Sequence, residues 1–112
     1  MLAKPYRLTK DKDFERLARE GRAVYGGELM LKWRLNNLKQ SRFGFVVSKK
    51  VDKRAVVRNK IKRRLRAIVR ENLSKIRPGY DVMILTRSEI KNLTFMQLKN
   101  KIDDLLIRAK LL

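Results

Sequence analysis

The sequence predicts a single mixed domain of the α/β class, with elements in the order α-β-β-α-β-α along residues 1–112. Two observations predict the elements: some stretches repeat apolar residues at helical spacing, while shorter ones alternate or run apolar over the length of a strand. Gly, Pro and Asn clusters separate these stretches. With 112 residues, 44% of them apolar, the chain can bury one core but is too short for two.

The first element is predicted to be a helix over residues 10–20, because Phe14, Leu17 and Ala18 share one helical face. Thr9 suits the N-cap of this helix. Gly21 is placed to end it in a left-handed conformation.

Two strands are predicted next. Residues 28–35, ELMLKWRL, carry an apolar residue at every second position, which indicates a strand with one buried face that includes Trp33. Arg42–Ser48, RFGFVVS, is apolar on both faces, as is typical of a central strand covered on both sides. We expect these two strands to form a hairpin, and residues 22–35 leave room for a further strand.

The second half of the chain predicts a helix, a strand and a helix. The basic segment forms a long helix to about Ser74, the sequence RPG at residues 77–79 ends it, and Tyr80–Thr86 is a short apolar strand. Thr94 and Gln97 form a capping box. The last helix carries apolar residues at helical spacing, namely Phe95, Leu98, Ile102, Leu105 and Leu106.

The charge of the chain indicates a polyanionic partner. Thirty Lys and Arg residues against eleven Asp and Glu give a formal charge of +19, which attracts nucleic acid first and an anionic membrane second. Cys and His are both absent, so disulfides, thiolate metal sites and the commonest general base are excluded. The N-terminal residues lack the apolar region of a signal peptide, and no eighteen apolar residues run together, so we expect a cytoplasmic protein.

The basic segment sorts its charge by face when it is placed on a helix. Nine of the eighteen residues from Lys53 to Arg70 are Lys or Arg. At 100° per residue the apolar side chains form one stripe, made of Val57, Ile61, Leu65, Ile68 and Val69. The opposite stripe holds Asn59, Arg63, Arg66 and Arg70, with Arg58 and Lys62 on one flank and Lys60 and Arg64 on the other. Like charges at this spacing repel one another unless phosphates neutralise them, so this face is predicted to bind a polyanion.

Charge alone does not decide which polyanion is bound. A helix of this kind would suit a DNA major groove, RNA loops and junctions, or a ribosomal protein with no processing role. Membrane binding is disfavoured, because the helix has no apolar insertion face once its stripe is committed to the core.

Catalysis by the chain itself is not expected. The close carboxylate pairs are Asp11 with Asp13 and Asp103 with Asp104, and neighbours one or two positions apart on a helix point in different directions. We therefore assign no catalytic residue, no metal ligand and no cofactor to this chain.

The run AVVRNKIKRRLR, residues 55–66, resembles the signature of the bacterial ribonuclease P protein component. The motif of that family, Arg-Asn-Arg followed by a hydrophobic residue and Lys-Arg, stands here as Arg58, Asn59, Lys60, Ile61, Lys62 and Arg63. Lys60 stands where the motif has its second Arg, so the positive charge is kept but the planar guanidinium group, which can make paired hydrogen bonds, is absent. Similar blocks at residues 7–22, 44–51 and 80–87 extend the resemblance over nearly the whole chain.

The resemblance implies a particular arrangement of the elements. It is an α/β (α+β) two-layer sandwich like domain 2 of ribosomal protein S5, with a mixed sheet. The segment from Val46 through the basic helix to Ile84 would form a left-handed β-α-β crossover, whereas the general rule alone predicts a right-handed one.

The resemblance also implies a function as the protein subunit of the endoribonuclease that removes the 5′ leader of precursor tRNA. The catalytic centre and its Mg²⁺ would belong to the RNA partner, and neither a membrane nor a small-molecule substrate is expected. The residues expected to contact the catalytic RNA are Arg58, Asn59, Lys60, Lys62, Arg63, Arg66, Arg70, Lys49 and Lys50.

A second RNA surface is implied between the first helix and the sheet, where the single-stranded leader binds. Phe14 would stack on a leader base and contribute about 1–3 kcal/mol to the binding free energy, or it would be an ordinary core residue. Ala18 and Lys32 occupy cleft positions where family members often carry aromatic residues. Leader binding would then depend more on charge than on stacking. For Trp33 we expect core packing.

Overall fold

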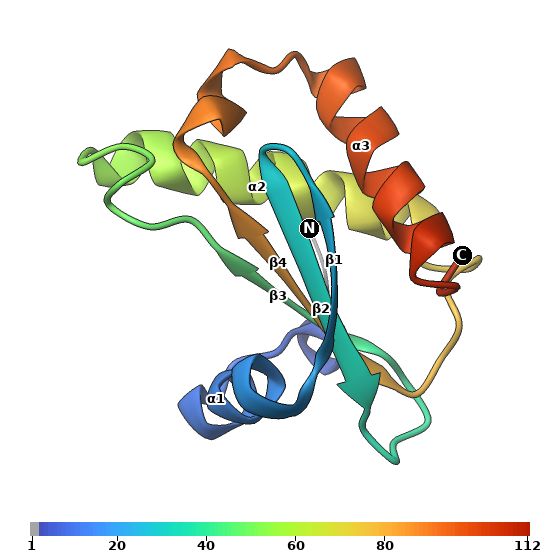
Figure 1. The fold of residues 1–112 in the computed structure, drawn as a ribbon. Coiled ribbons are helices and arrows are strands. Elements are labelled where there is room, and N and C mark those ends of the chain that lie inside the picture. Colours follow the sequence, from blue (N-terminus) through green and yellow to red (C-terminus); the bar gives the residue numbers. More distant parts are fainter. Residues whose placement is uncertain (1–2) are drawn as a thin grey trace.

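The computed structural model describes residues 3–112 and shows a four-stranded mixed sheet with three α-helices (Figure 1). Its elements in chain order are η1 (Lys4–Tyr6), α1 (Asp11–Glu20), β1 (Arg22–Gly26), β2 (Leu29–Leu35), β3 (Arg42–Val46), α2 (Ala55–Asn72), β4 (Tyr80–Thr86), η2 (Ser88–Asn92) and α3 (Phe95–Arg108). The predicted α+β class is confirmed, including the further strand, which is β1. The two 3-10 helices η1 and η2 were not predicted. No described helix is long and apolar enough to cross a membrane.

The strands lie in the order β1-β2-β4-β3, which corrects two predictions. The predicted hairpin between residues 28–35 and 42–48 is wrong, because β2 pairs with β1 on one side and with β4 on the other. Gly27, at φ 60°, allows the tight turn of the β1–β2 hairpin. β3 is an edge strand rather than a central one, and it pairs in parallel with β4.

The apolar character of β3 has a different cause from the one predicted. Along β3, Phe43 packs into the large core on one face of the sheet, while Val46 packs with Phe14 of α1 on the other. Leu8 covers part of the free edge, since its N–H donates to the carbonyl of Phe43 at 2.8 Å. Both faces of β3 therefore carry packed apolar side chains although the strand lies at the edge of the sheet.

The connection from β3 through α2 to β4 is left-handed, as the family resemblance implied. In Figure 1 the parallel strands β3 and β4 point the same way and α2 runs behind them. About 98% of such connections are right-handed, so the general rule fails here.

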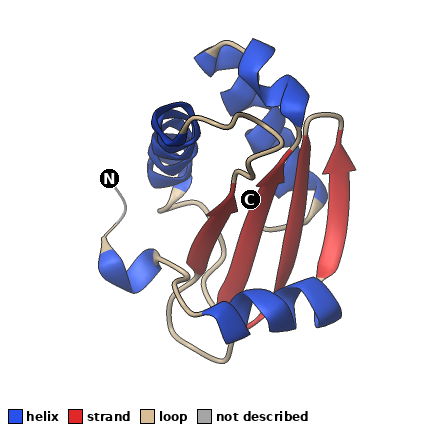
Figure 2. Ribbon diagram, turned by 90° about the vertical axis from the view of Figure 1, so that its left-hand side faces the viewer, coloured by secondary structure: helices blue, strands red, loops and turns tan. Residues whose placement is uncertain are grey.

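The sheet separates a large core from a small one. α2 and α3 pack on one face, where Leu31 and Ile84 are buried against Leu65 and Ile102. α1 lies across the strands apart from α2 and α3 (Figure 2), and it buries Leu17 in the small core.

Strand alternation accounts for this division, because successive residues of β4 enter different cores. Val82 and Ile84 belong to the large core and Met83 to the small one. The predicted core stripe of the basic helix is confirmed, with Ile61, Leu65, Ile68 and Val69 buried and Val57 half-buried. Trp33 packs against the large core, as expected.

The helix ends confirm one predicted cap and correct two others. Gln97 N donates to Thr94 Oγ1 at 3.2 Å and Thr94 N donates to Gln97 Oε1 at 2.9 Å, so the capping box of α3 is confirmed. Thr9 does not cap α1, because the chain stays extended up to Lys10, which is the N-cap residue. Gly21 ends α1 with φ −73° rather than left-handed. A Cβ there would lie 2.5 Å from the carbonyl oxygen of Leu17.

Candidate RNA interface

The exposed side of α2 is a basic face, and its side chains are largely uncommitted within the protein. Asn59, Arg63 and Arg70 are exposed, as the helical projection predicted, whereas Arg66 is half-buried. Seven cationic residues lie between Arg58 and Arg70. In residues 3–112, Arg58 alone among these seven makes a side-chain hydrogen bond or ion pair with the protein. The remaining six therefore have no internal partner to offset their mutual repulsion.

Arg58 has a different position from its neighbours in the motif. Its Nη1 donates to the carbonyl oxygens of Asp52 at 3.0 Å and Lys53 at 2.8 Å, so it braces the loop that enters α2. Asp52 fixes the same loop, because its carboxylate accepts from the backbone and guanidinium of Arg54 and from Lys91 Nζ. The bonds from Arg54 hold the pKa of Asp52 well below its usual value of 3.8.

Lys49 and Lys50 are exposed in the loop between β3 and α2. The hydroxyl of Ser88 donates to the carbonyl of Lys50 at 3.2 Å, which ties this loop to η2. Both lysines thus lie on a braced loop at the N-terminal end of the basic face.

A groove lies between α1 and the sheet. One hollow of about 480 Å³ has an apolar floor that includes Val46, Met83 and Leu85, with α1 on one side and Lys62 of α2 on the other. A second hollow of about 220 Å³ shares Lys62 and adds Arg66. Both hollows also share Phe14, so we treat them as one site, the α1 groove.

Phe14 lies between the two hollows and packs on the backbone of β3. It is half-buried. A Cβ added at Gly44 would lie 2.4 Å and 2.5 Å from two ring carbons of Phe14, so only glycine lets the ring pack so closely. Phe14 therefore contributes to the small core and also lines the groove.

The two other predicted groove residues have different positions. Ala18 lines the α1 groove. Lys32 faces α1 from β2, in register with Met83, but it does not line the groove. Its Nζ donates to the carbonyl of Ala18 at 2.8 Å, which places a positive charge at the C-terminal end of the helix dipole.

The groove also contains residues that the sequence did not single out. Arg7 lines the smaller hollow, and Glu15 lines the larger one as an acidic residue. Arg7 reaches the groove because its backbone forms an isolated parallel bridge with Phe43. No local sequence signal predicts such a bridge.

Ion pairs fix α1 on the sheet, and they give Asp13 and Asp81 a structural role. Arg42 donates to Asp81 through Nε at 2.9 Å and Nη2 at 2.7 Å, and its Nη1 lies 3.6 Å from Asp13. The hydrogen bonds from Arg42 to Asp81 raise the pKa of Arg42. In residues 3–112, no three His, Cys, Asp or Glu side chains form a group that could hold a metal ion.

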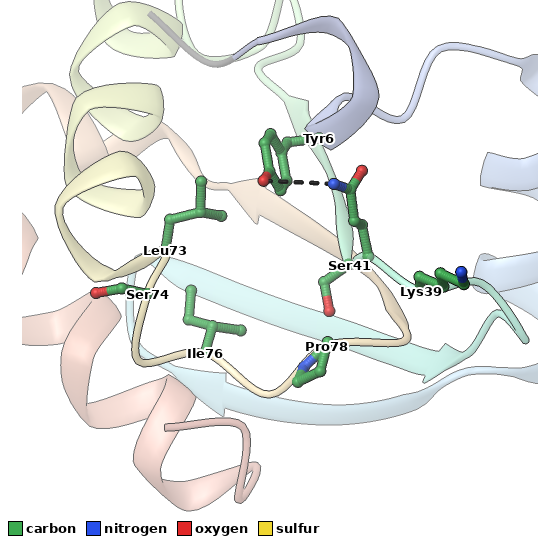
Figure 3. A pocket seen from close by; sticks show the side chains of 8 residues that line it. Tyr6, Lys39, Ser41, Leu73, Ser74, Ile76 and Pro78 are labelled. Carbon is green, nitrogen blue, oxygen red and sulfur yellow. Dashed lines mark hydrogen bonds between the residues drawn. The ribbon is translucent and has the colours of Figure 1, made fainter.

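Another hollow, of about 300 Å³, lies near the C-terminal end of α2 (Figure 3). Tyr6, Leu73, Ile76 and Pro78 contribute to its lining, and Lys39 is its one cationic residue. This hollow therefore does not extend the basic face of α2.

Sequence and structure comparisons agree on one family. The family model for ribonuclease P matches residues 2–110. This chain belongs to the ribonuclease P protein family. The ribonuclease P protein component of a Cyanothece species is 38% identical, over 100% of this chain and 98% of that protein. That of Roseiflexus castenholzii is also 38% identical, over 96% of this chain and 88% of that one.

Solved structures of the family have the same fold. A Staphylococcus aureus RNase P protein mutant with defective mRNA degradation activity has a TM-score of 0.91 at 33% identity, covering 97% of this chain and 92% of that chain. The Thermotoga maritima RNase P protein in complex with 1-(4-fluorophenyl)-2-thiourea has a TM-score of 0.84 at 33% identity, covering 91% and 98%. Membership of the family connects this chain with a ribonucleoprotein that processes tRNA.

Proposed function

We propose that this protein binds the catalytic RNA of ribonuclease P through the basic face of α2 and binds the 5′ leader of precursor tRNA in the α1 groove. The observation that carries the proposal is the set of six cationic side chains on α2 that have no partner within residues 3–112. Phosphates would supply those partners and would release condensed counterions on binding. The members assigned to the catalytic RNA are Arg58, Asn59, Lys60, Lys62, Arg63, Arg66, Arg70, Lys49 and Lys50.

The α1 groove suits a single strand rather than a duplex. Its apolar floor offers contact area for unstacked bases, and Lys62 and Arg66 lie along one side for the backbone phosphates. Phe14 and Phe45 line both hollows, and Phe14 is the ring that we assign to base stacking. Lys32, at the end of α1, adds positive charge nearby while it fixes the helix.

The proposal assigns hydrolysis to the RNA partner. The reaction is endonucleolytic removal of the 5′ leader, and the Mg²⁺ that it requires would be bound by RNA. The protein would reduce the repulsion between two polyanions and hold the leader in place. These contributions need cationic and apolar surfaces but no general base, and the chain has no histidine. The site of action would be the cytoplasm.

Reconstitution tests the proposal directly. The full chain is mixed with a bacterial RNase P RNA and a precursor tRNA at low Mg²⁺ concentration, and 5′ cleavage is followed on a gel. We expect strong stimulation over RNA alone, no cleavage by protein alone, and loss of cleavage on addition of a chelator. RNA binding without stimulation would instead indicate a basic nucleic-acid-binding protein with no processing role, and it would refute the proposal.

A further inference from the structure

Cationic side chains on the two sides of α2 line two different hollows. Lys62 and Arg66, four residues apart, line the α1 groove. Lys60 and Arg64 have the same spacing on the opposite flank, and they line a separate hollow of about 280 Å³ between α2 and the η2–α3 segment. We call this hollow the α3-side pocket.

The α3-side pocket combines an apolar floor with a cationic rim. Its floor consists of Val57, Ile61, Ile90, Leu93 and Leu98. The rim consists of Lys60, Arg64 and Lys91, and no acidic residue lines the pocket. Lys91 is engaged by Asp52 at 3.3 Å, whereas Lys60 and Arg64 make no side-chain bond within residues 3–112. The two uncommitted cations are therefore available for a ligand.

An unpaired nucleotide fits this chemistry. A base needs an apolar surface to lie against once it leaves its stack, and its phosphate needs positive charge at the mouth of the site. Lys60 would contact that phosphate as a point charge, which requires no guanidinium fork. We propose that the α3-side pocket receives one unpaired nucleotide of the RNase P RNA, with its phosphate held by Lys60 and Arg64.

The position of the pocket favours the RNase P RNA over the precursor leader as the source of this nucleotide. This inference rests on the proposed function. The body of α2, about 10–12 Å across with its side chains, separates the pocket from the α1 groove. The pocket instead lies beside the basic face, because Lys60, an exposed cation of that face, lines its rim.

Paired variants test the assignment of the two flanks. K60A/R64A is compared with its matched control K62A/R66A, which removes the same charges at the same spacing from the other flank. We expect K60A/R64A to weaken binding of RNase P RNA at least tenfold without changing how precursor affinity depends on leader length. K62A/R66A, whose residues also belong to the basic face, should weaken RNase P RNA binding as well, but unlike K60A/R64A it should reduce that leader dependence. If K60A/R64A binds RNase P RNA like the wild type while R63A/R70A binds weakly, the pocket assignment is wrong and the proposed function stands.

Site-directed cross-linking tests the nucleotide itself. The chain has no cysteine, so one cysteine introduced at Leu93 or at Glu15 carries a photoreactive group without side reactions. In the complete complex with precursor tRNA, L93C should cross-link to RNase P RNA at a single-stranded position, and E15C should cross-link to the leader. Cross-linking of L93C to the leader, or to neither RNA, would overturn the assignment. If no α2 variant binds RNase P RNA more weakly, the proposed function itself fails.

Discussion

α2 and α3 pack on the same face of the sheet and both carry several cations, but they use them differently. In α3, Lys99 lies 3.1 Å from Asp103, Lys101 lies 3.1 Å from Glu28, and Arg108 donates to the carbonyl of Tyr25 at 2.9 Å. In α2, six of the seven cations from Arg58 to Arg70 make no such contact in residues 3–112.

This difference separates charge that serves the fold from charge that serves a partner. The one acidic residue of α2, Glu71, lies 3.7 Å from Lys99 of α3 and leaves the basic face unrelieved. Each like-charge pair on a helix costs a few tenths of a kcal/mol, so the basic face lowers the stability of the isolated protein. RNA phosphates would offset that cost.

The largest expected effect follows from removing the uncommitted charge. The triple variant R63A/R66A/R70A should bind RNase P RNA at least roughly 1,000-fold more weakly at low salt, since it removes three charge-assisted hydrogen bonds that contribute about 1.5–3 kcal/mol each. Filter binding measures this. The matched control K99A/K101A removes two paired charges of α3 and should bind within about twofold of the wild type. Equal losses in the two variants would show that net charge alone decides affinity.

A smaller effect is expected in the α1 groove, where we place the leader and which Lys62 and Arg66 of α2 line. F14A should weaken leader-dependent precursor binding by about 1–3 kcal/mol if the ring stacks on a base. F14L keeps an apolar side chain against Gly44 but has no ring. Comparable losses in both variants support stacking, whereas recovery in F14L would mean that Phe14 serves only to pack α1. Neither variant should change the affinity for RNase P RNA without precursor.

The contact between Asn72 of α2 and Asp103 of α3, which we call the α2–α3 seam, should affect the stability of the fold and not RNA binding. Asn72 is buried, and its Nδ2 donates to Asp103 Oδ1 at 2.6 Å. N72A should lower the free energy of unfolding by about 1–3 kcal/mol, because a hydrogen bond to the half-buried Asp103 carboxylate is lost. Urea titration measures the change. A loss of RNA affinity in folded N72A would mean that the seam also shapes the binding face.

The smallest expected effect is a pH dependence at the start of α2. The pKa of Asp52 lies below its usual value of 3.8, because hydrogen bonds from Arg54 and Lys91 stabilise the carboxylate. Its contribution to stability is therefore present above about pH 4 and is lost as the pH falls towards the lowered pKa. Thermal unfolding should show D52N less stable than the wild type at pH 7, with the difference shrinking at pH 3. A difference that grows in acid would contradict this assignment.

Local patterns predicted the parts of the fold that depend on local chemistry. The alternation of β2, the apolar strand Tyr80–Thr86, the capping box of α3 and the two faces of the basic helix follow from spacing and residue type. The sheet order did not follow, because β4 pairs with strands that precede it by more than thirty residues and inserts between them. No local signal specifies such a pairing.

The candidate site was predictable to a similar extent. Spacing identified the basic face but not that Arg58 turns back to the carbonyls of Asp52 and Lys53. Lys60 was the ambiguous member of the motif in the sequence. The α3-side pocket gives it a position, but one wall of that pocket comes from η2, a short 3-10 helix with no periodic pattern to predict it.

The salt dependence of binding tests the central claim most directly. If the basic face of α2 neutralises roughly five phosphates, log K for RNase P RNA should fall with log salt at a slope of about −4, and somewhat less steeply for single strands. R63A/R66A/R70A should reduce the magnitude of that slope by about 2 to 3, while K99A/K101A should leave it unchanged. The same slope in all three proteins would show that the uncommitted charge of α2 does not form the RNA interface.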